Sequence, residues 1–127
     1  MIFVIITSVV YKYVNKKVKL NINNIKRIDV IKLPVPPKKK VVTKKEDIVE
    51  IINFINSIQL LEEINDPVKG WIYTINIYNN SNNTNNTIEF LGDKINIYNK
   101  WYKINDNNLE KLRKIYKDLN YEQASFP

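Results

Sequence analysis

The chain of 127 residues contains neither cysteine nor histidine. Without cysteine it can form no disulfide, thiolate nucleophile or cysteine-ligated metal site. Without histidine it lacks the commonest general base and the commonest transition-metal ligand, so Ser-His and Cys-His catalytic groups are excluded. The two glycines, Gly70 and Gly92, are too few for a glycine-rich phosphate-binding loop. We therefore expect a protein that is not an enzyme and that uses no cofactor and no metal.

Basic residues outnumber acidic ones by 20 to 13, which gives a formal net charge of +7. Arginine is scarce among them, with only Arg27 and Arg113, whereas recognition of phosphates and base edges favours the planar guanidinium group. The charge is also uneven, because residues 1–45 hold twelve basic residues and one acidic residue, and residues 46–127 hold eight and twelve. The scarcity of arginine argues against a nucleic-acid partner. The basic N-terminal third could be an arm that lies beside an anionic surface, which would be lipid headgroups or a cell-wall polyanion. It could instead be a linker with solvated lysines.

The chain begins with an apolar stretch, Met1–Val14, whose uninterrupted part ends near Tyr11. This is shorter than the ~20 residues that a helix needs to span a bilayer. It fits either the last part of a membrane anchor or a strand over Phe3–Val10 that packs into the fold. Lysines 12, 16, 17 and 19 follow at once, and positive charge beside a span normally stays cytoplasmic, which argues against export.

The periodic patterns that follow predict one domain over residues 25–120, after an apolar segment and basic spacer (1–24) and before a tail (121–127). Alternation predicts a strand over Ile25–Leu33, which the next prolines end. Thr43-Lys44-Lys45-Glu46 is typical of a capping box at a helix start, and Asn107 with Glu110 offers a second capping pattern. The two apolar helical stripes consist of Ile48, Ile51, Ile52, Ile55 and Ile58, and of Leu109, Leu112, Tyr116 and Leu119.

The segment Gly70–Ile104 is the centre of the predicted fold. Two-residue turns at Gly92-Asp93 and Asn99-Lys100 would make it an antiparallel β-meander. The first turn would place Phe90 opposite Ile95. The second would place Ile97 opposite Tyr102 and Ile95 opposite Ile104, so that apolar side chains share one face. We therefore predict an α+β domain with an antiparallel β-meander of four to five strands and two helices packed on one face.

The second face of this meander carries polar and aromatic side chains. Its predicted rows contain Glu89, Asn96 and Lys103, and then Thr87, Tyr98 and Trp101. Aromatic rings with polar neighbours can stack on sugars, bases or a partner's side chains. The same face could instead be covered by the N-terminal strand or the last helix, or the rings could form a stabilising pair. The candidate binding face consists of Asn76, Tyr78, Tyr98 and Trp101.

Three sequence patterns follow one another along the chain: T-x-x-E-D-I-x-x-I-I-x-x-I-N from Thr43, G-W-x-Y-x-I-x-I-Y from Gly70, and W-Y-K-I from Trp101. Together, over Ile25–Leu119, they resemble small domains of unknown function in low-GC Gram-positive bacteria, which usually follow a lipoprotein signal or a single membrane anchor. The resemblance implies an extracytoplasmic domain held at the membrane and assigns no functional residue. Lipoprotein attachment requires a cysteine that this chain lacks, so a helix would be the anchor.

Three functional hypotheses follow. The leading one is a non-enzymatic, membrane-tethered ligand- or protein-binding module on the extracytoplasmic side, with an unknown protein or a cell-wall ligand as its partner. The alternative is a cytoplasmic nucleic-acid-binding protein that uses the lysines between Lys12 and Lys45 and the aromatic face. A third is a wall-carbohydrate enzyme that uses Glu62 or Glu50, although their neighbourhoods fit solvated surface better.

Overall fold

The computed structural model of the protein describes most of the domain and its flanks. Most of the apolar stretch Met1–Val14, including the alternative strand Phe3–Val10, lies outside the described residues. The described residues are 13–21, 24–33, 36–65, 70–79 and 85–125.

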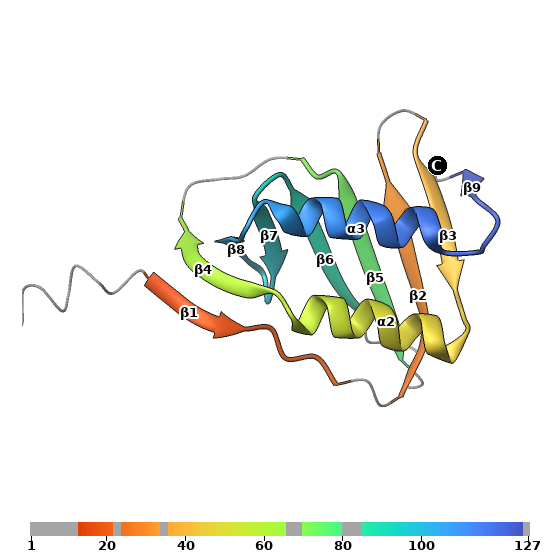
Figure 1. The fold of residues 1–127 in the computed structure, drawn as a ribbon, viewed down its shortest axis with the longest axis horizontal. Coiled ribbons are helices and arrows are strands. Elements are labelled where there is room, and N and C mark those ends of the chain that lie inside the picture. The colour runs from red at the N-terminus through yellow and green to blue at the C-terminus, as the bar shows by residue number, and fades with distance from the viewer. Residues whose placement is uncertain (1–12, 22–23, 34–35, 66–69, 80–84, 126–127) are drawn as a thin grey trace, which may run out of the picture.

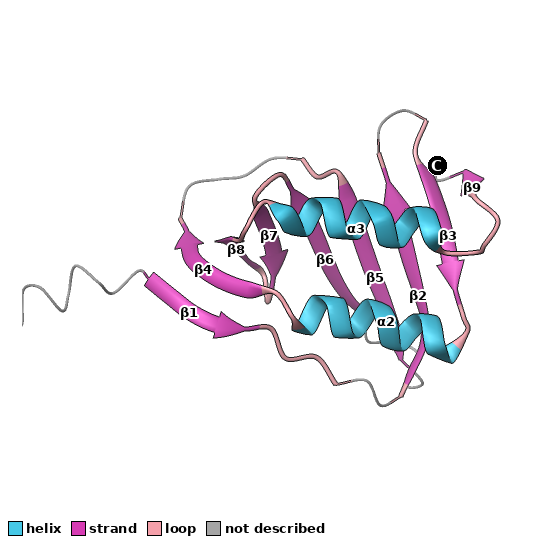
Figure 2. Cartoon of the chain, in the orientation of Figure 1, coloured by secondary structure: helices cyan, strands magenta, loops and turns pink. Residues whose placement is uncertain are grey.

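Within these residues, nine strands form one sheet, and two helices lie across the same side of it (Figures 1 and 2). The helices are α2 (Lys45–Asn56) and α3 (Asn107–Asp118). The strands are β1 (Tyr13–Lys17), β2 (Ile25–Lys32), β3 (Lys38–Val42), β4 (Gln59–Ile64), β5 (Tyr73–Asn79), β6 (Asn85–Leu91), β7 (Lys94–Ile97), β8 (Lys100–Lys103) and β9 (Ala124–Ser125).

The strand order is β1-β4-β8-β7-β6-β5-β2-β3-β9, and every pairing is antiparallel. The mixed class with two helices is therefore confirmed, whereas the expected four to five strands are too few. The additional strands were hard to predict because β1 and β3 are rich in lysine and β9 has two residues. A strand of this kind shows little apolar alternation and is defined by its partner in the sheet.

The β6–β7 hairpin has the predicted register. Phe90 pairs with Ile95, and Gly92 takes a φ of +61° in the turn between the strands. A side chain at this backbone angle would be strained, and glycine avoids that cost. The local sequence of this turn was therefore sufficient to predict how β6 and β7 pair.

The β7–β8 hairpin corrects the second predicted turn. Ile95 pairs with Tyr102 rather than Ile104, because the chain turns at Tyr98 and Asn99 and not at Asn99-Lys100. Tyr98 and Asn99 have φ values of 58° and 62°, and positive φ at both central residues is what a type I′ hairpin turn requires. The shift in pairing is two residues, so the side chains predicted to face the helices still do so.

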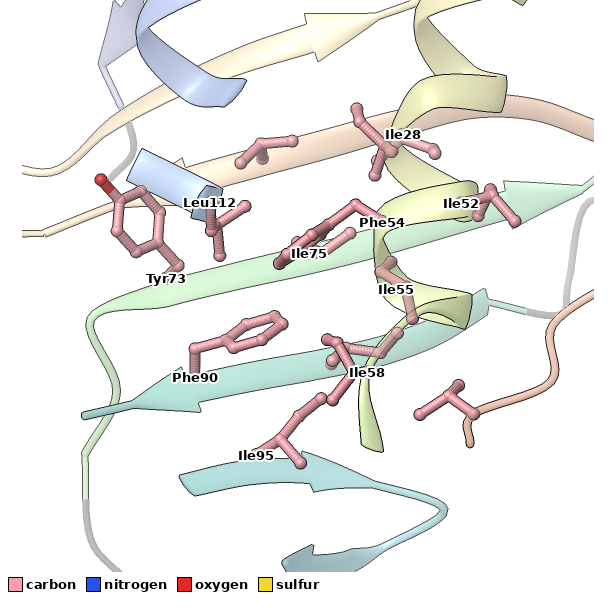
Figure 3. Close-up of a cluster of buried hydrophobic side chains, with 14 of the residues drawn as sticks. Ile28, Ile52, Phe54, Ile55, Ile58, Tyr73, Ile75, Phe90, Ile95 and Leu112 are labelled. Carbon is pink, nitrogen blue, oxygen red and sulfur yellow. The ribbon is translucent and has the colours of Figure 1, made fainter. Parts of the chain in front are cut away.

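The hydrophobic core lies between the helices and the sheet (Figure 3). The whole predicted stripe of α2 is buried, since its isoleucines and the following Ile58 are at most 4% exposed. Phe54 of α2 stacks on Phe90 of β6, with ring centroids 6.2 Å apart. From the second stripe, Leu112, Tyr116 and Leu119 are buried and Leu109 is partly so. Each fully buried aliphatic side chain contributes roughly 1.5–3 kcal/mol, so the isoleucine-rich α2 is a main source of stability.

Neither predicted capping pattern forms. Helix α2 has Lys44 as its N-cap, without a side-chain cap, and the amide of Lys44 donates a 3.0 Å hydrogen bond to the hydroxyl of Tyr121. Helix α3 has Asp106 as its N-cap, also without a side-chain cap, and the amide of Asn107 donates to Asn105 Oδ1 at 3.0 Å. The predicted caps Thr43 and Asn107 are therefore wrong, and the side chains of Tyr121 and Asn105 accept from the amides of Lys44 and Asn107 instead.

The sheet extends beyond the predicted domain bounds at both ends. Strand β1 pairs with β4, and the side-chain amide of Asn56 accepts from the Leu20 amide at 2.7 Å and donates to the Leu20 carbonyl at 3.1 Å. At the other end, β9 pairs with Lys38 and Lys39 of β3. Part of the expected basic spacer and part of the expected tail are thus elements of the fold.

Candidate binding face

The sheet has a face that points away from both helices, which we call the open face (Figure 2). Side chains alternate along a strand, so the neighbours of the core-facing residues point to this side. One row across the strands runs Asp29, Asn76, Thr87, and the next runs Ile31, Thr74, Glu89, Asn96, Trp101. The open face is defined by these residues together with Arg27 and Tyr78.

Two hydrogen-bonded pairs occupy the middle of the open face. Thr87 Oγ1 donates to Asn76 Oδ1 at 2.8 Å, and Asn96 Nδ2 donates to Glu89 Oε1 at 3.0 Å. A carboxamide has two N–H donors and one oxygen acceptor, and a carboxylate has two oxygens, so one bond uses part of this capacity. The pairs hold the amide and carboxylate groups in place while further donors and acceptors remain for a polar ligand.

At one end of the open face, an arginine is held between a carboxylate and an aromatic ring. Arg27 Nε lies 3.0 Å from Asp29 Oδ1, and the guanidinium carbon lies 4.2 Å from the centre of the Tyr78 ring. The Asp29 side chain is 7% exposed and that of Arg27 is 43% exposed. Because a buried carboxylate needs a partner, Arg27 compensates the charge of Asp29 and leaves this region close to neutral.

Thr74 lies in the same row as Glu89 and Asn96 and is 6% exposed. Among the described residues, its Oγ1 has no hydrogen-bond partner. A buried hydroxyl without a partner costs about 1–3 kcal/mol. Because this oxygen is itself buried, a ligand on the open face would not reach it.

The structure separates the four predicted binding residues into three places. Asn76 and Tyr78 lie two residues apart on β5, and Tyr78 is paired with Arg27. Trp101 lies on β8, three strand spacings from Asn76, or about 14 Å. The expected cross-strand pair of Tyr98 and Trp101 is wrong, because Trp101 pairs with Asn96 once the turn falls at Tyr98.

Tyr98 belongs to a groove at the end of the sheet rather than to the open face. Its ring is 50% exposed, and its hydroxyl accepts from the Lys19 amide at 3.3 Å and donates to the Lys19 carbonyl at 3.4 Å. The hydroxyl thus connects the β7–β8 turn to the segment after β1. The groove has a volume of about 270 Å³ and is lined by Leu20, Asn86, Thr87, Ile88, Ile97, Tyr98 and Asn99.

Sequence reasoning missed four members of the open face, namely Arg27, Asp29, Ile31 and Thr74. Alternation along Ile25–Leu33 placed the first two on one side of a strand. It could not show that this strand pairs with β5, where Asp29 meets Asn76 and Arg27 meets Tyr78. The cluster depends on a pairing between segments far apart in the sequence, and no local pattern reports such a pairing.

The fold is a small α+β domain whose two helices lie on one side of the sheet. No protein-family model, curated protein or solved structure matches the chain. Within the described ranges, no helix has both the length and the apolar character needed to cross a membrane.

Proposed function

We propose that this protein is a non-enzymatic binding module, tethered to the outer side of a membrane, whose open face binds a hydroxyl-rich cell-wall ligand. The observation that carries the proposal is the position of both helices on one side of the sheet. On the other side lie the ordered amide and carboxylate pairs Asn76–Thr87 and Glu89–Asn96. Trp101 provides an aromatic surface at one end of this polar region, and Tyr78 at the other end is stacked on Arg27.

A polar ligand fits the open face better than a protein does. Protein interfaces depend on a central cluster of apolar or aromatic side chains that become fully desolvated. Among the described residues, Tyr98 is the large hydrophobic residue that is exposed. It lies outside the open face. Amide and carboxylate groups beside aromatic rings suit ligands with many hydroxyl groups and flat apolar patches.

The tether is proposed from the sequence. The apolar start, the lysines that follow it and the resemblance to membrane-anchored domains support an anchor near the N-terminus. Strand β1 begins at Tyr13, so an anchor that ends near Tyr11 would hold the sheet close to the membrane surface. Protease treatment of intact cells should then degrade the domain, and a protein that stays protected in the cytosol would contradict the tether.

Ligand binding is tested with purified cell-wall polysaccharide and the full chain. Trp101→Ala should reduce co-sedimentation with the polysaccharide at least tenfold, because the open face loses its largest aromatic surface. The matched control is Trp71→Ala, which removes the other tryptophan of the chain from a position before β5. Binding that is absent in the unmodified protein, or equally reduced in both variants, would overturn the proposed ligand.

A further inference from the structure

A second candidate site lies on the helix-covered side of the sheet, where α3 passes over β2 and β3 (Figure 1). It is a pocket of about 370 Å³. Four of its six lining residues are basic and none is acidic. The lining residues are Lys32, Lys40, Arg113, Tyr116, Lys117 and Gln123.

The sheet brings the lysines of this pocket together by register. Lys40 pairs with Val30, and Lys32 pairs with Lys38, so all three lysines share the helix-covered face. Like charges directly opposite each other in a sheet are destabilising. A cluster of lysines is therefore stabilised by a negative charge nearby. The residues that pair with Lys40 and Lys32 on the adjacent strands are Val30 and Tyr73, so neither position supplies a carboxylate.

Helix α3 supplies the other two cations and the centre of the pocket. Arg113 and Lys117 are four residues apart and therefore lie on the same side of the helix, next to Tyr116. The ammonium nitrogens of Lys40 and Lys32 lie 4.6 Å and 5.3 Å from the centre of the Tyr116 ring. The Tyr116 hydroxyl donates to Gln123 Oε1 at 2.9 Å, which orients both side chains.

Lys40 lines the pocket and is 7% exposed. Its Nζ donates to the carbonyls of Tyr116 and Leu119 at 2.7 and 2.8 Å, at the carbonyl end of α3. An ammonium group has three donors, so one remains after these two bonds. Burial lowers the pKa of Lys40, the nearby charge of Lys32 lowers it further, and Asp118 raises it. Burial and the repulsion from Lys32 therefore both destabilise the charged form of Lys40.

Two carboxylates lie near the pocket, and each already forms an ion pair, Glu110 with Arg113 of the pocket and Asp118 with Lys114 outside it. The second of these pairs has a distance of 3.3 Å between Lys114 Nζ and Asp118 Oδ2. Among the described residues, Lys32 and Lys117 have no carboxylate within salt-bridge distance. Most of the positive charge of the pocket is thus left without an internal counter-ion.

We propose that this pocket binds a small anion that carries a doubly charged phosphate group. Several lysine ammonium groups that converge on one space can each donate to a phosphate oxygen as a point charge, and Arg113 can add a planar pair of donors. The volume falls within the range of roughly 300–1,000 Å³ that small-molecule sites occupy, which leaves room for a short organic group on the phosphate. The pocket lies on the opposite side of the sheet from the open face, so this binding is independent of the function proposed above.

The test is a titration of the full chain with inorganic phosphate and with glycerol 3-phosphate at low ionic strength, followed by nuclear magnetic resonance of the backbone amides. Saturable shifts should centre on residues 32, 40 and 113–117. The double variant Lys32→Gln/Lys117→Gln should raise the dissociation constant at least tenfold. It leaves Lys40 in place, so the hydrogen bonds from Lys40 to the carbonyls at the end of α3 are kept and the variant should fold.

The matched control is Lys45→Gln/Lys111→Gln, which removes the same charge from exposed positions outside the pocket. Its dissociation constant should stay within twofold of the unmodified protein. A parallel assay measures sedimentation with vesicles that contain phosphatidic acid. Binding to such vesicles alone, lost in the pocket variant and kept in the control, would identify a lipid headgroup as the source of the phosphate. Absence of both kinds of binding, or equal weakening in the two double variants, would overturn the proposal.

Discussion

The hydroxyl of Tyr121 donates a 2.7 Å hydrogen bond to Oδ2 of Asp47, a residue 74 positions earlier in the chain. The same hydroxyl accepts from the amide of Lys44 at 3.0 Å. The side chain therefore closes the first turn of α2 in place of a local capping residue. Through this contact, the segment after α3 stabilises the start of the other helix.

Replacing Tyr121 by phenylalanine should lower the free energy of unfolding by about 1–2 kcal/mol, because both partners lose their hydrogen bond while the ring is kept. Urea denaturation followed by circular dichroism measures the change. Tyr78→Phe is the control, since its ring packs on Arg27 and the described contacts do not involve its hydroxyl. Equal losses in the two variants would show that the Tyr121 hydroxyl has no special role.

Stability should fall as the pH rises above about 10. Burial raises the pKa of Tyr73, Tyr116 and Tyr121, and the hydrogen bond to Asp47 raises that of Tyr121 further. Their ordinary value is about 10, so the folded state retains these protons where the unfolded chain releases them. The contribution of these tyrosines to the free energy of unfolding is therefore complete below about pH 10 and is lost as the pH rises through their raised pKa values. Urea denaturation between pH 8 and pH 12 should show this fall, and Tyr121→Phe should make it shallower.

Lys40 should contribute a pH dependence of the opposite sign. Its pKa is lowered by burial and by Lys32, so the folded state releases this proton before the unfolded chain does. The free energy of unfolding should therefore rise as the pH increases through the lowered pKa toward about 10.5, and be unaffected by Lys40 above that. In Lys40→Met, this rise should be absent. A variant that keeps the full rise would assign it to other groups.

The β7–β8 turn should respond to changes at Asn99, which has a φ of 62°. Glycine takes this conformation without strain, and alanine does not. Asn99→Gly should keep or raise the stability by up to about 0.5 kcal/mol, and Asn99→Ala should lower it by about 1 kcal/mol. Thermal unfolding measures both, with Asn120→Ala, an exposed asparagine outside any positive-φ turn, as the control. Tolerance of alanine at residue 99 would contradict the turn.

The contact between Phe90 and Phe54 should be essential to the core. Phe90 is fully buried, and its ring lies 6.2 Å from that of Phe54 at an angle of 27° (Figure 3). Phe90→Ala should lower the free energy of unfolding by about 3–5 kcal/mol, and Phe90→Leu by clearly less, because it leaves a smaller cavity. Chemical denaturation measures the difference. A loss below about 1 kcal/mol for the alanine variant would mean that Phe90 does not pack against α2.

Much of the candidate site lay beyond sequence reasoning. Alternation correctly separated Asn96 and Glu89 from the core-facing Ile95 and Phe90, because side-chain direction in a strand has a period of two residues. It did not reveal the Arg27–Asp29–Tyr78 cluster, which needs β2 beside β5, nor the separation of Trp101 from Tyr98. These depend on which strands pair and on where a turn begins.

The sequence by itself determined the parts of this protein that short-range patterns encode. The isoleucine stripe of α2, the turn at Gly92 and the face of each meander strand follow from helical and strand periodicity and from the backbone freedom of glycine. Only the tertiary structure decided that Tyr121 completes the first turn of α2 and that Lys32 and Lys40 meet Arg113 and Lys117 around Tyr116. Contacts of this kind join residues far apart in the chain, and they arise from the order of the strands rather than from any local spacing.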